Sequence, residues 1–248
     1  MERRQMAWYA YCITEQSTFS NGRVRRPFPI DNLRGINGSP VFAYPSGDFA
    51  VIVSEYTPET PLVQQSLAEH GRVISECFRN RTVLPFKFGT IFESDEALRH
   101  AVRVNRKAFT ESVEQLRGKA EMHLKVTVKE GGALNLPELQ LPMQAGGEYL
   151  IKLREKASRD RERQTKARAL SVQVHKMFNP LQEEVSCKKV QTGIMLDIAH
   201  LIDTTQISKY QTRYSTAIGQ LKNCEVVLSG PWPPYHFMPG KLRTQKSD

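Results

Sequence analysis

The alternation of hydrophobic and polar positions in the first half predicts strands separated by turns. Residues 7–14 form a short aromatic-rich run that is typical of a central strand. The run VFAYPSGDFAVIVSEY predicts a hairpin with strands at 41–44 and 49–56, joined through Pro, Ser, Gly and Asp. Residues 18–40 are rich in Gly, Pro, Asn and Asp and are predicted to be a long loop.

A helical period follows this hairpin. Thr60 and the proline after it predict a helix start, and the pattern ends near Arg79. Residues 82–92, TVLPFKFGTIF, resemble a strand, although the internal proline marks an edge or a bulge. Ser94 predicts the cap of a second helix, which Gly118 ends. The apolar stripe of this second helix is Leu98, Val102, Phe109, Val113 and Leu116.

The second half predicts a more regular order. An alternating strand at 121–128 is followed by a Gly-rich loop at 131–147 and a long helical pattern at 148–178. Two strands, SCKKVQT and GIMLDIAHLI, then precede an amphipathic helix and a last strand, CEVVLSG. The resulting order, β-α-β-β-α-β, is that of ferredoxin-like domains.

These elements predict an α+β protein of two domains. Residues 1–118 would form a smaller sheet-and-helix domain, and residues 119–248 a ferredoxin-like domain. The helix at 148–178 is about 45 Å long at ~1.5 Å per residue, and its middle, SRDRERQTK, is polar on all sides. Either two helices are joined in this middle, or one helix projects from the domain with a solvated middle; a projecting helix or helical hairpin, with or without a kink, is favoured. A projecting charged arm would suit contact with a partner.

Charge is unevenly distributed along the chain, which has a formal net charge of +9. Up to Gly118 there are 15 basic and 13 acidic residues, and from Lys119 onward there are 20 and 13. Residues 152–168 hold eight basic and three acidic residues, so this run could bind nucleic acid or another anionic surface. Because the two signs are interspersed at helical spacing, a solvated helix face is the favoured interpretation.

Other features exclude several classes of protein. There is no apolar run of about 18 residues that would predict a membrane helix, and the N-terminus resembles no cleaved signal, so we expect a cytoplasmic protein. The four cysteines are widely spaced without a CxxC pair, which predicts small buried hydrophobes in a reducing compartment. The six histidines show no metal-binding spacing, so we expect no metal and no cofactor.

No catalytic motif is present in the sequence. It lacks GxSxG, a P-loop, a GxGxxG after a strand, and HExxH. The glycine pair at 146–147 precedes a helix, but no Lys, Ser or Thr follows at the spacing of a phosphate-binding loop. His70, His123 and His200 are interpreted as satisfied structural residues. The strands MHLKVTV and GIMLDIAHLI lack aromatic residues, so an RNA-stacking platform is missing and nucleic acid is an unlikely partner.

The segment SGPWPPYHF near the end of the chain combines three prolines with three aromatic residues. It directly follows an apolar strand, and its aromatic side chains are too large to expose at little cost. We therefore expect a structural clasp folded against the C-terminal domain. The less favoured alternative is a free polyproline ligand.

TVLPFKFGTIF, AGGEYLIKLREKA and LSGPWPPYHF, in this order and at these separations, resemble the gas vesicle protein F/L (GvpF/GvpL) family. The resemblance extends to YAYCIT, FAVIVSEY and LKVTV and spans residues 8–237, although Cys12 stands where the family usually has glycine. The residues marked by these motifs as candidates for partner contact are Leu84, Pro85, Phe86, Phe88, Gly89, Gly146, Gly147, Tyr149, Leu150, Arg154, Arg161, Arg163, Pro231, Trp232, Pro234, Tyr235 and Phe237.

This resemblance implies an accessory protein of gas vesicle formation, not an enzyme. Gas vesicles are cytoplasmic protein shells that provide buoyancy. Such a protein would bind the hydrophobic GvpA-like shell subunit and other accessory gas vesicle proteins and assist nucleation or assembly, as a chaperone or as a minor vesicle component. The alternative is a basic nucleic-acid-binding or regulatory module. An enzyme acting on a small ligand would need a pocket with perturbed titratable groups.

Overall fold

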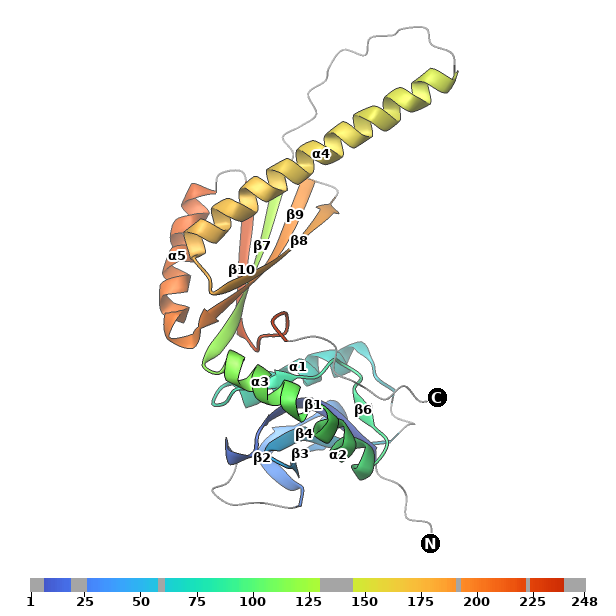
Figure 1. The fold of residues 1–248 in the computed structure, drawn as a ribbon, viewed down its shortest axis with the longest axis vertical. Coiled ribbons are helices and arrows are strands. Elements are labelled where there is room, and N and C mark those ends of the chain that lie inside the picture. Colours follow the sequence, from blue (N-terminus) through green and yellow to red (C-terminus); the bar gives the residue numbers. More distant parts are fainter. Residues whose placement is uncertain are drawn as a thin grey trace. The chain divides into compact units, whose positions relative to one another are not determined.

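The fold consists of two compact units, which are described separately below. The computed structural model describes residues 7–18, 26–57, 61–129, 145–190, 193–221 and 224–238. The first unit comprises residues 1–121 together with 232–248, and the second comprises residues 122–231. The mixed α+β fold class predicted from the sequence is confirmed (Figure 1). Within the described helices, none is both long enough and apolar enough to cross a membrane.

The first unit is built on one sheet with the strand order β2-β3-β4-β1-β5, and β6 also pairs with β1. The strands are β1 (Ala7–Glu15), β2 (Phe28–Arg34), β3 (Pro40–Ser46), β4 (Phe49–Tyr56), β5 (Leu84–Pro85) and β6 (Ile91–Phe92). The predicted hairpin is confirmed, because β3 and β4 pair from Phe42↔Val53 to Ser46↔Phe49. β1, the predicted central strand, has β4 on one side and β5 and β6 on the other.

Three helices belong to this unit: α1 (Gln64–Phe78), α2 (Asp95–Val104) and α3 (Arg106–Leu116). The predicted cap of α2 is confirmed, since the Ser94 hydroxyl accepts the N–H of Ala97 at 3.1 Å. The five residues of the predicted apolar stripe are buried. The stripe nevertheless spans two helices, because the backbone leaves helical geometry at Asn105, whose side-chain amide donates to the Ala101 carbonyl at 2.9 Å.

Three predictions for this unit need correction. The predicted loop at 18–40 contains β2, which periodicity misses because Asn32 has a positive φ and the pairing shifts between Pro29 and Arg34. α1 begins at Gln64, where the Ser66 hydroxyl accepts the N–H of Val63, and the predicted cap Thr60 lies outside the described residues. The predicted strand at 82–92 is reduced to the two short strands β5 and β6.

The second unit has the predicted order β-α-β-β-α-β. Its elements are β7 (Lys119–Lys129), α4 (Ala145–Phe178), β8 (Gln182–Val190), β9 (Gly193–Asp203), α5 (Ile207–Gln220) and β10 (Cys224–Trp232). The four strands are ordered β10-β7-β9-β8. Alternate residues of the central strands, such as Leu124 and Ile198, form a core with Val174 and Phe178 of α4 and Tyr210 of α5.

The long helical pattern forms one helix, α4, of 34 residues. This result decides between the two predicted alternatives in favour of a single helix. Its C-terminal part covers the sheet, whereas its N-terminal part extends past the strands (Figure 1). Most of the predicted loop at 131–147 lies outside the described residues.

The division of the chain differs from the predicted domains mainly at the end of the sequence. The first boundary lies between Glu121 and Met122, three residues after the predicted Gly118. Trp232–Asp248, however, group with the first unit. The clasp was expected to fold against the C-terminal domain, residues 119–248; residues 229–231 group with the second unit and 232–237 with the first, and His236 bonds Glu121, which lies within that predicted domain. The unit boundary therefore falls inside the segment, near the end of β10.

Candidate partner-binding surface

The LPFKFGT segment is anchored to the centre of the first sheet. Leu84 and Pro85 pair with β1, and the N–H of Phe86 donates to the Tyr11 carbonyl at 2.9 Å. Leu84, Pro85 and Phe86 are buried, whereas Phe88 and Gly89 are exposed. Of the five candidate residues in this motif, three therefore belong to the core and two can face a partner.

A buried hydrogen-bond network holds the exposed part of the motif in place. His70 of α1 lies between Tyr9 of β1, whose hydroxyl is 2.9 Å from Nδ1, and the Phe86 carbonyl, which is 3.2 Å from Nε2. A carbonyl can only accept, so we assign the proton to Nε2 and the accepting role to Nδ1. The Tyr9 hydroxyl also accepts the N–H of Gly89 at 3.1 Å. The turn after Phe88 is thereby tied to both β1 and α1.

Burial sets the protonation of this network. Removal of the His70 imidazole from water lowers its pKa, because the charged form loses hydration. Burial likewise raises the pKa of Tyr9 to about 12, although the Gly89 N–H opposes that shift. Both groups are therefore neutral near pH 7 and act as structural hydrogen-bonding groups. The interpretation of His70 as a satisfied structural residue agrees with this geometry.

An apolar surface lies beside this network, and we call it the α1 patch: Val63, Leu67 and Phe88. These side chains are 50%, 54% and 38% exposed, respectively. Val63, Leu67 and His70 follow one another at spacings of four and three, so they are neighbours along α1. The ring of Phe88 lies 5.7 Å from the ring of His70. Leu62 lies next to Gly89, within 3.9 Å of where a Cβ on that residue would be.

The sequence motifs identified only Phe88 of this patch. Val63 and Leu67 occupy helix positions that an apolar period assigns to the core, but their exposure shows that they are not used there. Two exposed aliphatic side chains at the start of α1, together with an exposed aromatic ring that packs against His70 of that helix, present a surface suited to apolar ligands. The sequence could have indicated this patch through two apolar positions, Val63 and Leu67, that lie outside the buried stripe of α1, which contains Val73, Ile74 and Cys77.

The first unit also contains a cationic cleft. A cleft of about 580 Å³ lies between the β3–β4 turn, residues 45–49, and three arginines of α2 and α3. The arginines are Arg99, Arg103 and Arg106, and Arg106 Nε donates to the Asp48 carboxylate at 3.0 Å. Guanidinium groups bind carboxylates and phosphates, so this cleft can receive an anionic group of a partner. No motif in the sequence marks these arginines.

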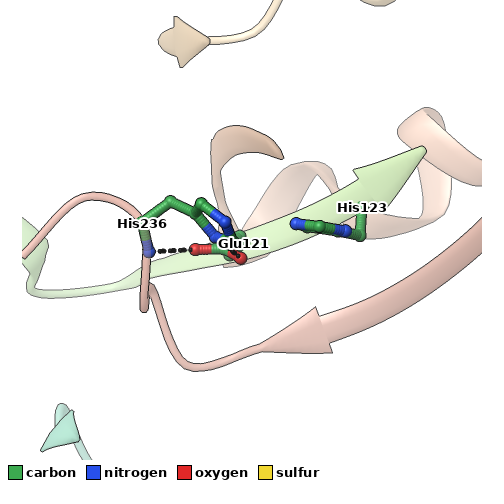
Figure 2. Close-up of side chains that lie close together, drawn as sticks. All are labelled: Glu121, His123 and His236. Atoms are coloured by element: carbon green, nitrogen blue, oxygen red, sulfur yellow. Dashed lines mark hydrogen bonds and ion pairs between the residues drawn. The ribbon is translucent and has the colours of Figure 1, made fainter. Parts of the chain in front are cut away.

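The aromatic segment at the end of the chain is only partly buried. Pro234 and Phe237 are buried, whereas Pro231, Trp232 and Tyr235 are exposed. The Glu121 carboxylate fixes the segment through two hydrogen bonds from His236, one from the backbone N–H and one from ring Nδ1, each 2.8 Å long (Figure 2). The segment is therefore tied down, as a clasp requires, and it still presents two aromatic rings.

The remaining candidate residues lie on α4. Arg154 and Arg161 are exposed on this helix. Gly146, Gly147, Tyr149, Leu150 and Arg163 fall in the helix too, but their side chains lie outside the described part of the structure. The candidate residues are thus divided between the two units, and of them Phe88 belongs to the α1 patch, through its ring contact with His70.

The second unit contains a buried polar cluster with a structural geometry. The His200 ring bonds the Tyr210 hydroxyl at 2.6 Å through Nδ1 and the Glu183 carboxylate at 2.7 Å through Nε2. Glu183 also lies 3.4 Å from the ring of His175. Burial lowers the pKa of His200 despite the neighbouring carboxylate. His123, two residues after Glu121 on β7, is 3.2 Å from Asp197 of β9.

Comparisons with known proteins agree on one family. The model of the family described as "Gas vesicle synthesis protein GvpL/GvpF" matches residues 7–239. Gas vesicle protein L of Streptomyces sp. (strain CB03234) is 25% identical over 242 residues, which cover 86% of this chain and 90% of that protein.

Two crystal structures share the fold. GvpF from Microcystis aeruginosa has a TM-score of 0.70 at 18% identity, covering 94% of this chain and 98% of that one. GvpF from Anabaena sp. PCC7120 has a TM-score of 0.71 at 17% identity, with coverages of 96% and 100%. The motifs, the fold and the extent of the family match lead to one conclusion: this chain belongs to the gas vesicle synthesis protein GvpL/GvpF family.

Proposed function

We propose that this protein assists gas vesicle formation by binding the hydrophobic GvpA-like shell subunit, together with other accessory gas vesicle proteins, before the subunit joins the shell. A subunit whose assembled form faces gas exposes apolar surface while it is free, and such surface aggregates in water. A partner that covers this surface reversibly keeps the subunit available for assembly.

The α1 patch is the observation that carries this proposal. Phe88 is exposed but held in place, because its ring packs against His70 and the N–H of the following Gly89 donates to the Tyr9 hydroxyl. A preformed apolar surface loses little conformational freedom on binding, so more of the contact energy appears as affinity. One member of the patch, Phe88, also belongs to LPFKFGT, one of the motifs that carry the family resemblance.

The arginine cleft supplies a second, polar contact for the same kind of partner. Arg99 and Arg103 face solvent in a concavity, where they can receive a carboxylate of a shell or accessory subunit. Charge pairs at such a rim contribute more to orientation and association rate than to affinity. The proposal therefore assigns binding strength to the α1 patch and orientation to the cleft.

The test is complementation of a strain in which this gene is cleanly deleted. We expect wild type to restore vesicles, and the double variant Leu67→Ser/Phe88→Ser to restore far fewer at equal protein level. Val227→Ser is the matched control, since Val227 is similarly exposed but lies in the second unit. Normal vesicles in the deletion strain, with no paralogue present, would refute an essential role.

The alternative role in binding nucleic acid rests on the net charge of +9. Nothing comparable to the α1 patch supports it, because β7 and β9 carry no aromatic residue on which bases could stack. A gel-shift assay with random-sequence DNA and RNA distinguishes the two roles. Tight binding that weakens steeply with salt would favour the alternative.

A further inference from the structure

Strand β8 forms an edge of the sheet in the second unit. Among the described strands it pairs with β9 and with no other, from Gln182↔Leu201 to Val190↔Gly193. An edge strand presents a row of backbone N–H and C=O groups that can pair with another strand. Figure 1 shows β8 at the border of its sheet.

The described residues of this edge lack two structural devices that usually prevent pairing, a bulge and a proline. The register with β9 continues without a bulge over nine residues, and the strand contains neither proline nor glycine. Proteins commonly block an edge with a bulge, a proline or a covering helix or loop. Charged side chains can also prevent an edge strand from pairing, and the arrangement of the charges on β8 therefore determines which strand it can pair with.

The charges on β8 are complementary to a second copy of the same strand. If two β8 strands pair antiparallel about a two-fold axis at Ser186, Glu184 lies opposite Lys188 of the second copy, and the reverse pair forms as well. Val185 then lies opposite Cys187 of the second copy, again twice. Within one strand, Glu184 and Lys188 are about 13 Å apart at ~3.3 Å per residue, so they cannot pair with each other.

The two faces of the strand agree with this register. Glu183 points to the helix face, where it meets His175 of α4 and His200. Successive side chains of a strand alternate between the two faces of the sheet. Val185 and Cys187 therefore share the helix face with Glu183, whereas Glu184 and Lys188 lie on the opposite face, which we call the open face. The paired strands would thus join apolar to apolar on one face and acid to base on the other.

A register shifted by one residue does not give these apolar and charge pairs. A shift of one residue would place Val185 opposite Lys188 and turn the helix face of one copy toward the open face of the other. The exposure of the strand also fits a site left open for a partner. Val185 is 40% exposed, and Glu184, Ser186, Cys187 and Lys188 are exposed as well. Cys187 thereby departs from the expectation that all four cysteines are buried.

We propose that two copies of this chain associate through β8, pairing antiparallel about a two-fold axis at Ser186 and joining their four-stranded sheets into one. The contact is isologous, because the same strand serves both copies. It uses backbone hydrogen bonds for association and the Glu184–Lys188 pairs for register. This inference is independent of the proposed binding of the shell subunit, which uses the first unit.

Cysteine pairing tests the register directly. In a Cys187→Ser background, Ser186→Cys places two thiols across the axis within the ~4.4–6.8 Å Cα separation that a disulfide needs. We expect mild oxidation of this variant to give a covalent dimer on a non-reducing gel. Glu184→Cys alone and Lys188→Cys alone should stay monomeric on that gel, whereas their equimolar mixture should give the covalent dimer. Equal cross-linking of all single variants would overturn the proposal.

Charge exchange tests the complementarity in the native protein. Sedimentation of wild type should show a reversible monomer–dimer equilibrium. Glu184→Lys puts like charges opposite each other twice and should raise the dissociation constant about tenfold. The exchange Glu184→Lys/Lys188→Glu restores both pairs and should restore the dimer. A wild type that stays monomeric up to about 1 mM, the weak end of specific association, or a dimer insensitive to both variants, would contradict the proposal.

Discussion

The Tyr9 hydroxyl lies 2.9 Å from Nδ1 of His70, and the two residues are 61 positions apart in the sequence. This pair connects the central strand of the first sheet to helix α1. Through the Gly89 N–H and the Phe86 carbonyl it also fixes both ends of the segment that carries Phe88. The α1 patch therefore depends on a buried polar contact that lies beneath it.

Removal of the Tyr9 hydroxyl should destabilise the first unit. Tyr9→Phe leaves the Gly89 N–H and His70 Nδ1 without their described partner, which costs about 1–3 kcal/mol. Both tryptophans of the chain, Trp8 and Trp232, belong to the first unit, so their fluorescence during urea unfolding reports on this unit. Tyr235→Phe, at an exposed position, is the control and should change stability little. Equal effects of the two variants would contradict this account.

Stability of the first unit should decrease in mild acid because of His70. Its pKa is lowered in the folded state, so below about pH 6.5 the unfolded chain binds a proton that the folded chain does not. The free energy of unfolding should then fall by about 1.4 kcal/mol per pH unit for this group, until the folded pKa is reached. His70→Gln should reduce that slope in urea titrations between pH 7.5 and 5.5. An unchanged slope would show that His70 is not the titrating group.

Gly35 should tolerate no side chain, although its backbone φ of −99° is available to any residue. A Cβ there would lie 2.6 Å from the Ser54 hydroxyl and still closer to the hydroxyl of Tyr11. Gly35→Ala should therefore cost about 1–3 kcal/mol through overpacking. Gly71→Ala on α1 meets no atom within 4 Å and should stabilise by up to about 1 kcal/mol. Thermal unfolding of both variants checks the difference in sign.

The sequence predicted well those elements whose side chains follow a local period. The β3–β4 hairpin, the cap at Ser94 and the order of the second unit could be identified because each depends on neighbours in the chain. β2 could not be predicted, because Asn32 has a positive φ and interrupts the alternation of side chains along the strand. The Tyr9–His70 pair and the α1 patch could not be predicted, since they bring together residues from β1, α1 and the turn at Phe88.

The end of the chain shows the same limit. The interpretation of SGPWPPYHF as a clasp rested on residue types and on the preceding strand, which indicated burial against the C-terminal domain but no particular contact residue. The structure adds the pairing of Glu121 with His236, which are 115 positions apart. It also separates Phe237, which is buried, from Trp232 and Tyr235, which are exposed.

Phe237 should contribute more to stability than Trp232. Phe237→Ala removes a buried ring and should cost about 3 kcal/mol, whereas Trp232→Ala removes a ring that is 40% exposed and should cost less. Because Trp232 is also a fluorophore, circular dichroism during thermal unfolding is the appropriate measurement. A larger loss for Trp232→Ala would mean that the exposed ring, and not Phe237, holds the clasp in place.

The central claim is that the α1 patch binds the shell subunit, and a binding measurement tests it most directly. The tagged protein is co-expressed with the GvpA-like subunit and purified, and the amount of subunit retained is quantified. The account predicts retention by wild type and by Val227→Ser, and a loss of at least tenfold for Leu67→Ser/Phe88→Ser. Equal retention by the patch variant and wild type, with both proteins folded, would contradict it.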